Sequence, residues 1–157
     1  MSLDSPQPRV TSGAAFRFGI AAARFNESLV DGLLARCLAR LRAAGVKAAN
    51  IAVVRVPGAH EVPWAAHELA RRGRVECVIG LGVLIGGDTN HHEMVGASVS
   101  QALQRVAMAT RVPVINGVIV VNSRAQAKVR CLGKIDRGSE FAAAALEMAA
   151  LRRRFSR

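Results

Sequence analysis

The residues with the clearest chemical potential form one run, Gly86-Gly87-Asp88-Thr89-Asn90, followed by His91. Paired glycines let the backbone bend and approach a ligand, and the residues after them can cap a helix whose free N–H groups attract an anion. A phosphate would fit there, with the Thr89 hydroxyl as a further donor. The Asp88 carboxylate would repel it unless the side chain turned away. From the local pattern alone, an ordinary glycine-rich helix cap is an equally good interpretation.

His91 and His92 come directly after this run, and a neutral imidazole there can transfer protons near pH 7. Adjacent helical side chains point about 100° apart, so His91-His92-Glu93 lacks the spacing of a metal site, and we expect no metal. His60 and His67 are each expected to be hydrogen-bonded structural residues.

Several familiar catalytic motifs do not occur in the sequence. Gly80-Leu81-Gly82 lacks the third glycine of a dinucleotide-binding loop, and Gly133-Lys134-Ile135 lacks the Ser or Thr of a P-loop. No G-x-S-x-G elbow is present, which argues against a serine hydrolase. These patterns weaken the case for dinucleotide or nucleoside triphosphate binding.

Strand and helix patterns alternate along the chain. Continuous apolar runs, typical of strands buried on both faces, alternate with segments whose apolar residues recur every three to four positions. The predicted strands are 16–23, 51–56, 75–83 and 112–121, and the predicted helices are 30–45, 61–73, one that opens after 86–90, 123–130 and 139–155. This alternation predicts an α/β, doubly wound fold around a parallel sheet.

Such sheets bind ligands beyond the carboxyl ends of their strands. Four polar segments are expected there, namely 23–26, 57–61, 86–93 and Asn116-Gly117. The third contains the glycine run, so it is the most informative of the four.

The length of 157 residues favours one folded domain over residues 15–157, preceded by a flexible arm over residues 1–14. We find no apolar run near the roughly 18 residues that cross a bilayer and no signal-peptide core, so we expect a cytoplasmic protein. The three cysteines match neither a disulfide framework nor a zinc ribbon.

The net charge of +11 raises the question of a polyanionic partner such as nucleic acid. Part of the excess lies in arginines around Gly73 and in the last six residues, where cations are typical of helix ends. Aromatic residues make up only 4%, with no tyrosine, which leaves no stacking surface for a single strand. Nucleic acid therefore stays a minor hypothesis.

Several short blocks, in order along the chain, resemble the 6,7-dimethyl-8-ribityllumazine synthases of riboflavin biosynthesis. The resemblance runs from about Phe18 to Leu151 and rests on 23–27, 56–63, 81–91 and 113–118, with later matches at Arg130, Arg137-Gly138 and 145–149. The expected fold is a three-layer sandwich with a flavodoxin-like, four-stranded parallel sheet flanked by helices on both faces.

The resemblance implies a transferase that condenses 5-amino-6-(D-ribitylamino)uracil with 3,4-dihydroxy-2-butanone 4-phosphate, releasing phosphate and water. It implies no cofactor and no metal. The pyrimidine substrate brings its own amine for imine formation, so the protein needs only placement, an anion site and a proton shuttle.

Motif positions imply a pyrimidine subsite and a phosphate subsite. Residues of the pyrimidine subsite would stack on the ring, line the ribityl pocket or present backbone groups to the uracil edge: Phe25, Ala59, His60, Glu61, Val83, Leu84 and Ile85. Residues of the phosphate subsite would be Gly87, Asp88, Thr89 and Arg130, with His91 moving protons.

The family resemblance also implies that each site lies between neighbouring subunits. Asn116, Arg130, Arg137 and Glu140 would then reach it from the adjacent chain. Family members form pentamers, and some build icosahedral shells, which the short 132–138 segment permits here.

Three positions depart from the family pattern: Gly86 replaces a frequent arginine, Asn116 a frequent aromatic residue and Arg137 a lysine. The alternative is a catalytically inactive, shell-forming or polyanion-binding relative.

Overall fold

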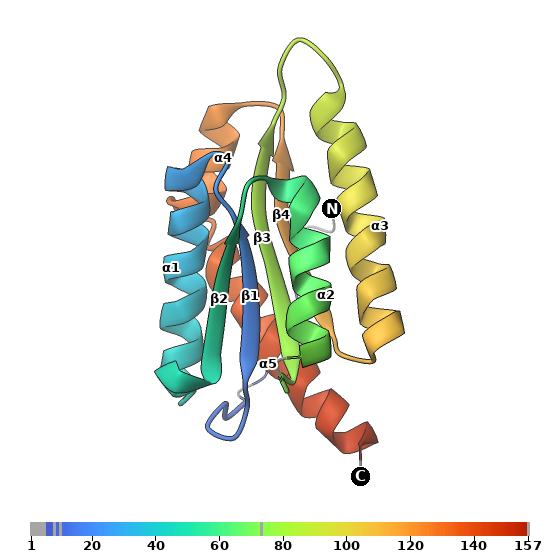
Figure 1. Cartoon of the computed structure of the whole chain (residues 1–157). Coiled ribbons are helices and arrows are strands. Elements are labelled where there is room, and N and C mark those ends of the chain that lie inside the picture. Colours follow the sequence, from blue (N-terminus) through green and yellow to red (C-terminus); the bar gives the residue numbers. More distant parts are fainter. Residues whose placement is uncertain (1–5, 8, 10, 73, 157) are drawn as a thin grey trace.

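A parallel sheet of four strands forms the centre of the computed structural model, which describes residues 6, 7, 9, 11–72 and 74–156 (Figure 1). The strands are β1 (Phe18–Ala23), β2 (Ile51–Val56), β3 (Cys77–Ile85) and β4 (Val114–Val121). The helices are α1 (Glu27–Ala43), α2 (Val62–Arg72), α3 (His91–Thr110), α4 (Arg124–Cys131) and α5 (Arg137–Phe155), with short 3₁₀ turns η1 (Ala48–Asn50) and η2 (Ala59–Glu61).

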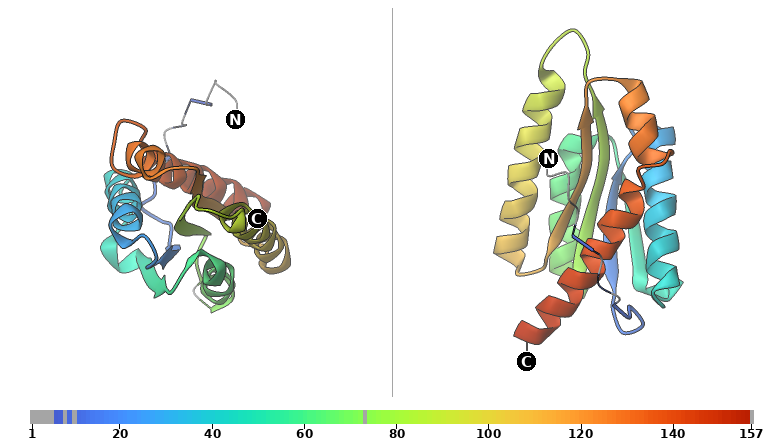
Figure 2. Two further views of the ribbon diagram at one scale, coloured as in Figure 1. Left: turned by 90° about the horizontal axis from the view of Figure 1, so that it is seen from above. Right: turned by 180° about the vertical axis from the view of Figure 1, so that it is seen from behind.

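The strand order β2-β1-β3-β4 and the parallel pairing confirm the predicted α/β, flavodoxin-like architecture. Helices cover both faces of the sheet and make a three-layer sandwich (Figure 2). α1 and α5 pack together on one face, whereas α2 and α3 pack together on the other.

Alternating side chains of β1 supply two separate cores. Phe18, Ile20 and Ala22 point to the α1/α5 face, whereas Ala21 and Ala23 point to the α2/α3 face. Every residue of β1 is buried, as expected of a central strand with a layer of helices on each side. The continuous apolar run in the sequence therefore indicated a strand correctly.

Several element boundaries differ from their predicted positions. β3 continues two residues past Val83, to Ile85, because β4 pairs with it as far as Val121. α5 begins at Arg137, before the predicted Ser139, because the Asp136 carboxylate accepts a hydrogen bond from the Ser139 N–H at 3.0 Å and caps the helix. The predicted end of α2 at Gly73 lies outside the described residues.

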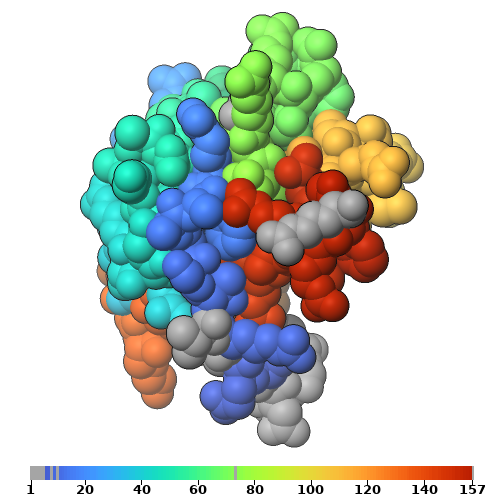
Figure 3. All heavy atoms as spheres, turned by 90° about the horizontal axis from the view of Figure 1, so that it is seen from below, coloured from blue at the N-terminus to red at the C-terminus, as the bar shows by residue number. Residues whose placement is uncertain are grey.

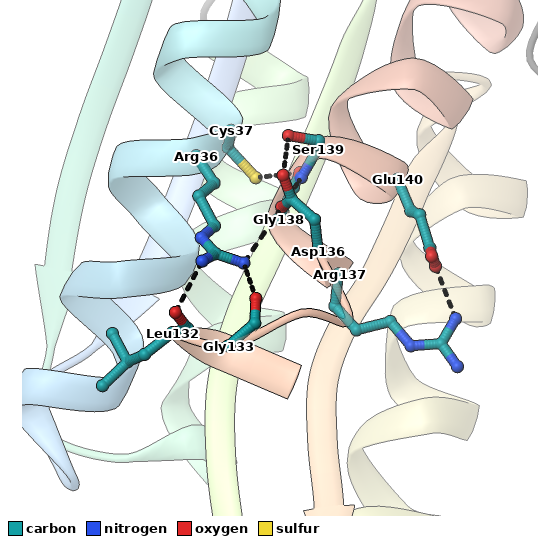
Figure 4. A network of polar contacts seen from close by, with 9 residues as sticks. All are labelled: Arg36, Cys37, Leu132, Gly133, Asp136, Arg137, Gly138, Ser139 and Glu140. Carbon is teal, nitrogen blue, oxygen red and sulfur yellow. Dashed lines mark hydrogen bonds and ion pairs between the residues drawn. The ribbon is translucent and has the colours of Figure 1, made fainter. Parts of the chain in front are cut away.

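The segment between α4 and α5 is fixed to α1 by Arg36 (Figure 4). Its guanidinium donates to the carbonyls of Leu132 and Gly133 at 2.6 and 2.9 Å and lies 3.6 Å from the Asp136 carboxylate. Burial alone would raise the pKa of Asp136, but hydrogen bonds from Ser139 and the charge of Arg36 lower it overall. These contacts determine where α5 starts.

The C-terminal part of α5, drawn in red, lies at the amino end of the sheet (Figure 3), and two of its arginines contact neighbouring segments there. Arg152 Nε donates to the Arg111 carbonyl at 3.0 Å. Arg153 donates to the Ala15 carbonyl at 2.8 Å and pairs with Glu76 at 3.1 Å. Its guanidinium also lies 4.6 Å from the centre of the Phe16 ring. These two cations therefore have structural partners.

The arm predicted over residues 1–14 lies partly outside the described residues. Among those that are described, the Gly13 N–H donates to the Ala44 carbonyl at 2.7 Å, and the Arg9 N–H donates to Glu147 at 2.8 Å. In the part of the chain that the structure describes, no helix is both long enough and apolar enough to traverse a bilayer.

Candidate functional site

A groove of about 370 Å³ lies at the carboxyl ends of β1, β2 and β3, beside the start of α3. It is where the doubly wound fold predicts a ligand. Its lining comes from three stretches that are distant in sequence: Phe25, Asn26, Gly58, Ala59, His60, Val83, Leu84, Ile85, Gly87, Thr89, His91, His92 and Val95. Three of the four predicted strand-end segments meet in it.

The loop after β1 presents an aromatic ring and fastens itself to β3. Asn26 adopts a left-handed backbone (φ 56°), which Asn tolerates better than most residues. Its side-chain amide does not cap α1 but donates to the Val83 carbonyl at 2.9 Å. The neighbouring Phe25 is 73% exposed and lines the groove, so its ring is available to a planar ligand.

β3 extends beyond β1 and exposes one edge of its backbone to the groove. β1 pairs with β3 only as far as Leu81, whereas β4 follows β3 to Ile85. The Gly86 N–H donates to the Val121 carbonyl on β4. Backbone groups of successive residues point to opposite edges of a strand, so those of Leu84 also point to β4, whereas those of Val83 and Ile85 point to the groove. Backbone groups without a strand partner are available to a ligand with amide-like edges.

The segment after β2 forms the turn η2, held by its own glutamate. The Glu61 carboxylate accepts a hydrogen bond from the Gly58 N–H at 2.8 Å, and the Glu61 N–H donates to the Gly58 carbonyl at 3.3 Å. Ala59 is buried against Gly82, whose hydrogen leaves room for it, since a Cβ there would lie 3.1 Å from the Ala59 Cβ. His60 is exposed and lines the groove.

The bend from Gly86 to Asn90 leads into the first turn of α3, as predicted. Asn90 is the N-cap residue, within the predicted capping segment, and its side chain makes no cap hydrogen bond. The first intrahelical bonds are donated by Glu93 and Met94 to the Asn90 carbonyl, so the N–H groups before them lack helical partners. Together with the positive end of the helix dipole, they favour an anion.

The two histidines of the first turn of α3 differ in environment. His91 is exposed and lines the groove. His92 is half-buried, and its Nε2 lies 3.4 Å from the Asn122 Oδ1 at the end of β4. The His92 Nδ1 is buried and has no hydrogen-bond partner among the described residues. No group of three or more metal-ligating side chains occurs among the described residues.

Glu61 and Asp88 lie next to the groove without lining it. Both are exposed, and Glu61 is engaged by the Gly58 N–H. The structure therefore leaves the Asp88 side chain out of the lining, while the adjacent Gly87 and Thr89 contribute to it.

Asn116 lies inside β4 rather than in a strand-end loop, which corrects its predicted position. It is opposite Gly80 in the middle of β3, and its Oδ1 accepts from the Val118 N–H at 3.1 Å. Asn-Gly is a turn signal, but the apolar residues on both sides pair continuously with β3. Gly117 is needed there, because a Cβ would lie 2.7 Å from the Gly80 carbonyl oxygen.

The remaining predicted site residues lie on α4 and α5, away from the groove of their own chain. Arg130 is half-buried on α4 and donates to the Gln126 carbonyl at 3.1 Å. Arg137 and Glu140 form an ion pair in the first turn of α5 (Figure 4). None of the three lines the groove.

The lining carries no lysine or arginine, and its ionisable groups are the imidazoles of His60, His91 and His92. An anion in this groove would therefore depend on backbone N–H groups, on these histidines and on cations from outside the chain's own lining.

Sequence reasoning did not assign Asn26, Gly58, His92 or Val95 to the lining. Asn26 had a usable signal, because it directly follows Phe25 at a strand end. His92 lies in the predicted 86–93 segment beside His91, but the place of its ring depends on how the bend before α3 meets the end of β4.

The sequence is similar to a well-populated family. A family model described as 6,7-dimethyl-8-ribityllumazine synthase matches residues 15–153. A protein of that name from Cupriavidus metallidurans is 39% identical over 139 residues, covering 88% of this chain and 80% of the relative. One from Thermococcus gammatolerans is 39% identical over 142 residues (90% and 91%), and one from Halorhodospira halophila is 40% identical over 138 residues (87% and 88%).

Proposed function

The chain belongs to the 6,7-dimethyl-8-ribityllumazine synthase family, and we propose that its strand-end groove carries out the family's reaction. That reaction condenses 5-amino-6-(D-ribitylamino)uracil with 3,4-dihydroxy-2-butanone 4-phosphate, releasing phosphate and water. The observation that carries the proposal is one groove that joins an exposed aromatic ring, an unpaired strand edge, a glycine bend at a helix N-terminus and His91.

The pyrimidine binds between Phe25 and the edge of β3 in this proposal. The Phe25 ring stacks on the flat heterocycle, and the backbone groups of Val83 and Ile85 pair with its amide-like edge. The Val83 carbonyl already accepts from Asn26, so the Ile85 backbone is the freer of the two. The ribityl chain extends toward Ala59, His60 and the Glu61 carboxylate, with Leu84 as an apolar wall.

The phosphate of the four-carbon substrate binds at the start of α3. Backbone N–H groups of Gly87, Asp88 and Thr89 contact it, while the Asp88 side chain stays outside the lining. This placement brings the phosphate next to His91 and leaves the substrate's carbonyl directed toward the pyrimidine amine.

His91 moves protons between the two substrates. The 5-amino group of the pyrimidine attacks the ketone, and loss of water gives an imine. A proton then leaves the neighbouring carbon and phosphate is lost. The ribitylamino nitrogen attacks the carbonyl that results, and loss of a second water closes the ring. An imidazole near its ordinary pKa can accept and return these protons. No lysine lines the groove, in agreement with an imine formed between the substrates rather than with the protein. No cofactor or metal takes part in these steps.

We also propose that the complete site includes an adjacent subunit, which supplies Asn116, Arg130, Arg137 and Glu140. The support is the lining itself, which contains no permanent cation although the proposed substrate carries a phosphate. Asn116 is exposed on the edge strand β4, and Arg130 is only half-buried on α4, so both are accessible to a neighbour. A guanidinium suits a phosphate because it donates two parallel hydrogen bonds.

The proposed assembly is a homopentamer, and the short α4–α5 connection allows it to build an icosahedral shell. We place the catalytic domain at residues 15–157 and the enzyme in the cytoplasm, with small-molecule substrates and no nucleic acid or membrane partner. The three cysteines are all unpaired and buried, in keeping with a reducing compartment.

One assay tests the proposal. Purified protein is mixed with both substrates, lumazine fluorescence is followed, and the same sample is sized by light scattering. We expect fluorescence that requires both substrates and a mass of at least five chains. A sample that binds flavin-like ligands but forms no lumazine would instead identify an inactive relative, and an active monomer would contradict the shared site.

A further inference from the structure

The two adjacent glycines of the phosphate bend have opposite surroundings. A Cβ on Gly86 would lie 3.1 Å from the His92 Nε2, 3.2 Å from the His92 Cε1 and 3.2 Å from the Asn122 Cα. A Cβ on Gly87 would meet nothing within 4 Å. Neither glycine has a positive φ. Gly86 is therefore required for space, and the group that occupies this space is an imidazole.

The His92 ring connects three elements at this point. It belongs to the first turn of α3, packs over Gly86 and approaches Asn122 at the end of β4. Asn122 is itself held, because its N–H donates to the Gln126 Oε1 at 2.9 Å, next to the Ser123 cap of α4. The ring thus ties the bend to the firmly bonded corner between β4 and α4.

The nitrogens of this ring are used unequally. If Nε2 carries the hydrogen, it can donate to the Asn122 Oδ1 at 3.4 Å, and the Nδ1 then has a lone pair. That Nδ1 is buried and has no partner among the described residues. A buried polar atom without a partner is unfavourable compared with an apolar ring edge, so ordinary packing does not explain why an imidazole is here.

We propose that His92 is a positioning residue of the phosphate subsite. Its ring holds Gly86 against the end of β4, so that the N–H groups of Gly87 to Thr89 are already directed at the substrate phosphate before it binds. The inference rests on the proposed function for the identity of the phosphate ester. Pre-organised donors increase affinity because less ordering is needed on binding.

Three replacements separate ring volume from hydrogen bonding. His92→Phe keeps a ring over Gly86 but cannot bond Asn122, His92→Gln can bond Asn122 through its amide, and His92→Ala does neither. For the phosphate substrate, we expect KM to rise about tenfold in His92→Ala and about threefold in His92→Phe, the size of one or two hydrogen-bond contributions. His92→Gln keeps the hydrogen bond but loses the ring, so it should raise this KM by about threefold as well. The pyrimidine KM and kcat should change by less than about twofold.

His67→Phe is the matched control, since His67 is an imidazole on α2 outside the groove. It should leave both KM values unchanged. Equal increases in both KM values in His92→Ala would indicate a general structural role and overturn the proposal. An unchanged phosphate KM in the same variant would overturn it as well.

Gly86→Ala provides an independent test through its contact with the ring. In the wild-type background, the new methyl group should displace His92 and raise the phosphate KM. In the His92→Ala background, most of that penalty should disappear because the ring is absent and only Asn122 remains close. Additive penalties would show that Gly86 and His92 do not act together, and would reject the proposed mechanism.

Titration with inorganic phosphate keeps this inference separate from the proposed function. Calorimetry on the intact wild-type protein and the His92 variants measures anion binding without turnover, and the same order of affinities is expected: wild type, then His92→Gln and His92→Phe, then His92→Ala. If the wild type forms no lumazine, the proposed function fails, but this order of phosphate affinities would still support His92. Equal phosphate affinities in all four proteins would exclude it.

Discussion

The two ends of the sheet use their polar residues in opposite ways. At the amino end, Arg152 and Arg153 are paired with carbonyls, a carboxylate and an aromatic ring. At the carboxyl end, the groove is lined by histidines, glycines and an exposed phenylalanine, without a lysine or arginine. The cations of this strongly basic chain are therefore not concentrated where a phosphate is expected to bind.

This difference shows that net charge is a poor guide to the anion site of the protein. Two of the C-terminal arginines that made a polyanion partner worth considering, Arg152 and Arg153, instead hold α5 to the amino end of the sheet. The expected anion site depends instead on backbone N–H groups at the start of α3, which contribute nothing to formal charge.

The largest expected effect follows from removing the groove's proposed proton shuttle. His91→Ala should lower kcat by about 10 to 10⁴-fold, which is the usual range of general acid–base catalysis. Steady-state lumazine formation measures it, with His67→Ala as the control at a distant imidazole. Unchanged turnover in His91→Ala would remove His91 from the mechanism and weaken the functional contrast between the two ends.

The next largest effect tests whether an adjacent subunit supplies the cation that binds the substrate phosphate. Arg130→Ala should raise the KM for the phosphate substrate by about 10 to 100-fold, because it removes a charge-assisted contact. Lys128→Ala, on the same helix, is the control. Mixing Arg130→Ala with His91→Ala chains should restore part of the activity, since some mixed interfaces then contain both residues. An increase confined to the pyrimidine KM would contradict the assignment.

The buried cysteine thiols make the stability of the protein depend on pH, and this dependence should differ between the two ends of the sheet. Burial raises the pKa of the Cys37 thiol to about 12 and that of Cys131 to about 11, and it raises the pKa of Cys77 as well, from an ordinary value of 9.0. Arg36 and Arg130 limit the increase at Cys131. Each thiol has a higher pKa in the folded protein than in the unfolded chain. Its contribution to the free energy of unfolding is therefore complete below pH 9 and is lost as the pH rises toward the folded pKa.

We expect the free energy of unfolding to fall by about 1 kcal/mol per thiol between pH 8 and pH 10. Denaturant titrations of Cys77→Ala and Cys131→Ala across this pH range measure how much each thiol contributes to that fall in unfolding free energy. The contribution of Cys131 should level off near pH 11, where its folded form ionises, while that of Cys77, at the amino end, should continue. Identical pH profiles for the two variants would contradict the different surroundings of these thiols.

The smallest effect concerns the structural arginines. Arg153→Ala should lower stability by about 1 to 2 kcal/mol through loss of a part-exposed ion pair, a carbonyl bond and a cation–π contact, with both KM values unchanged. Thermal unfolding measures it against Arg154→Ala, an exposed neighbour on the same helix turn. A change in phosphate KM without a loss of stability would mean that the amino end contributes to binding.

The fold was largely predictable because its signals are local. The apolar run of β1 and the β-branched run of β2 each indicated a strand without tertiary information. The expectation that both are buried on both faces holds only for β1, because β2 is the edge strand of the sheet and its residues 52–55 are exposed. Boundaries were less predictable where a distant partner sets them, as when β4 extends β3 to Ile85 or when Asp136 starts α5 two residues before Ser139.

The sequence by itself determined the α/β alternation, the strand-end location of the polar segments and the likeness to the lumazine synthases. Only the tertiary structure decided that Asn116 lies opposite Gly80 of β3, that the Asn26 amide bonds the first loop to β3, and that the His92 ring packs over Gly86. The pattern of apolar residues that predicts a helix or strand lies within a few neighbouring residues. Each of these contacts instead joins segments that meet only after the sheet has formed. The chain therefore specifies its elements locally and completes its groove through long-range packing.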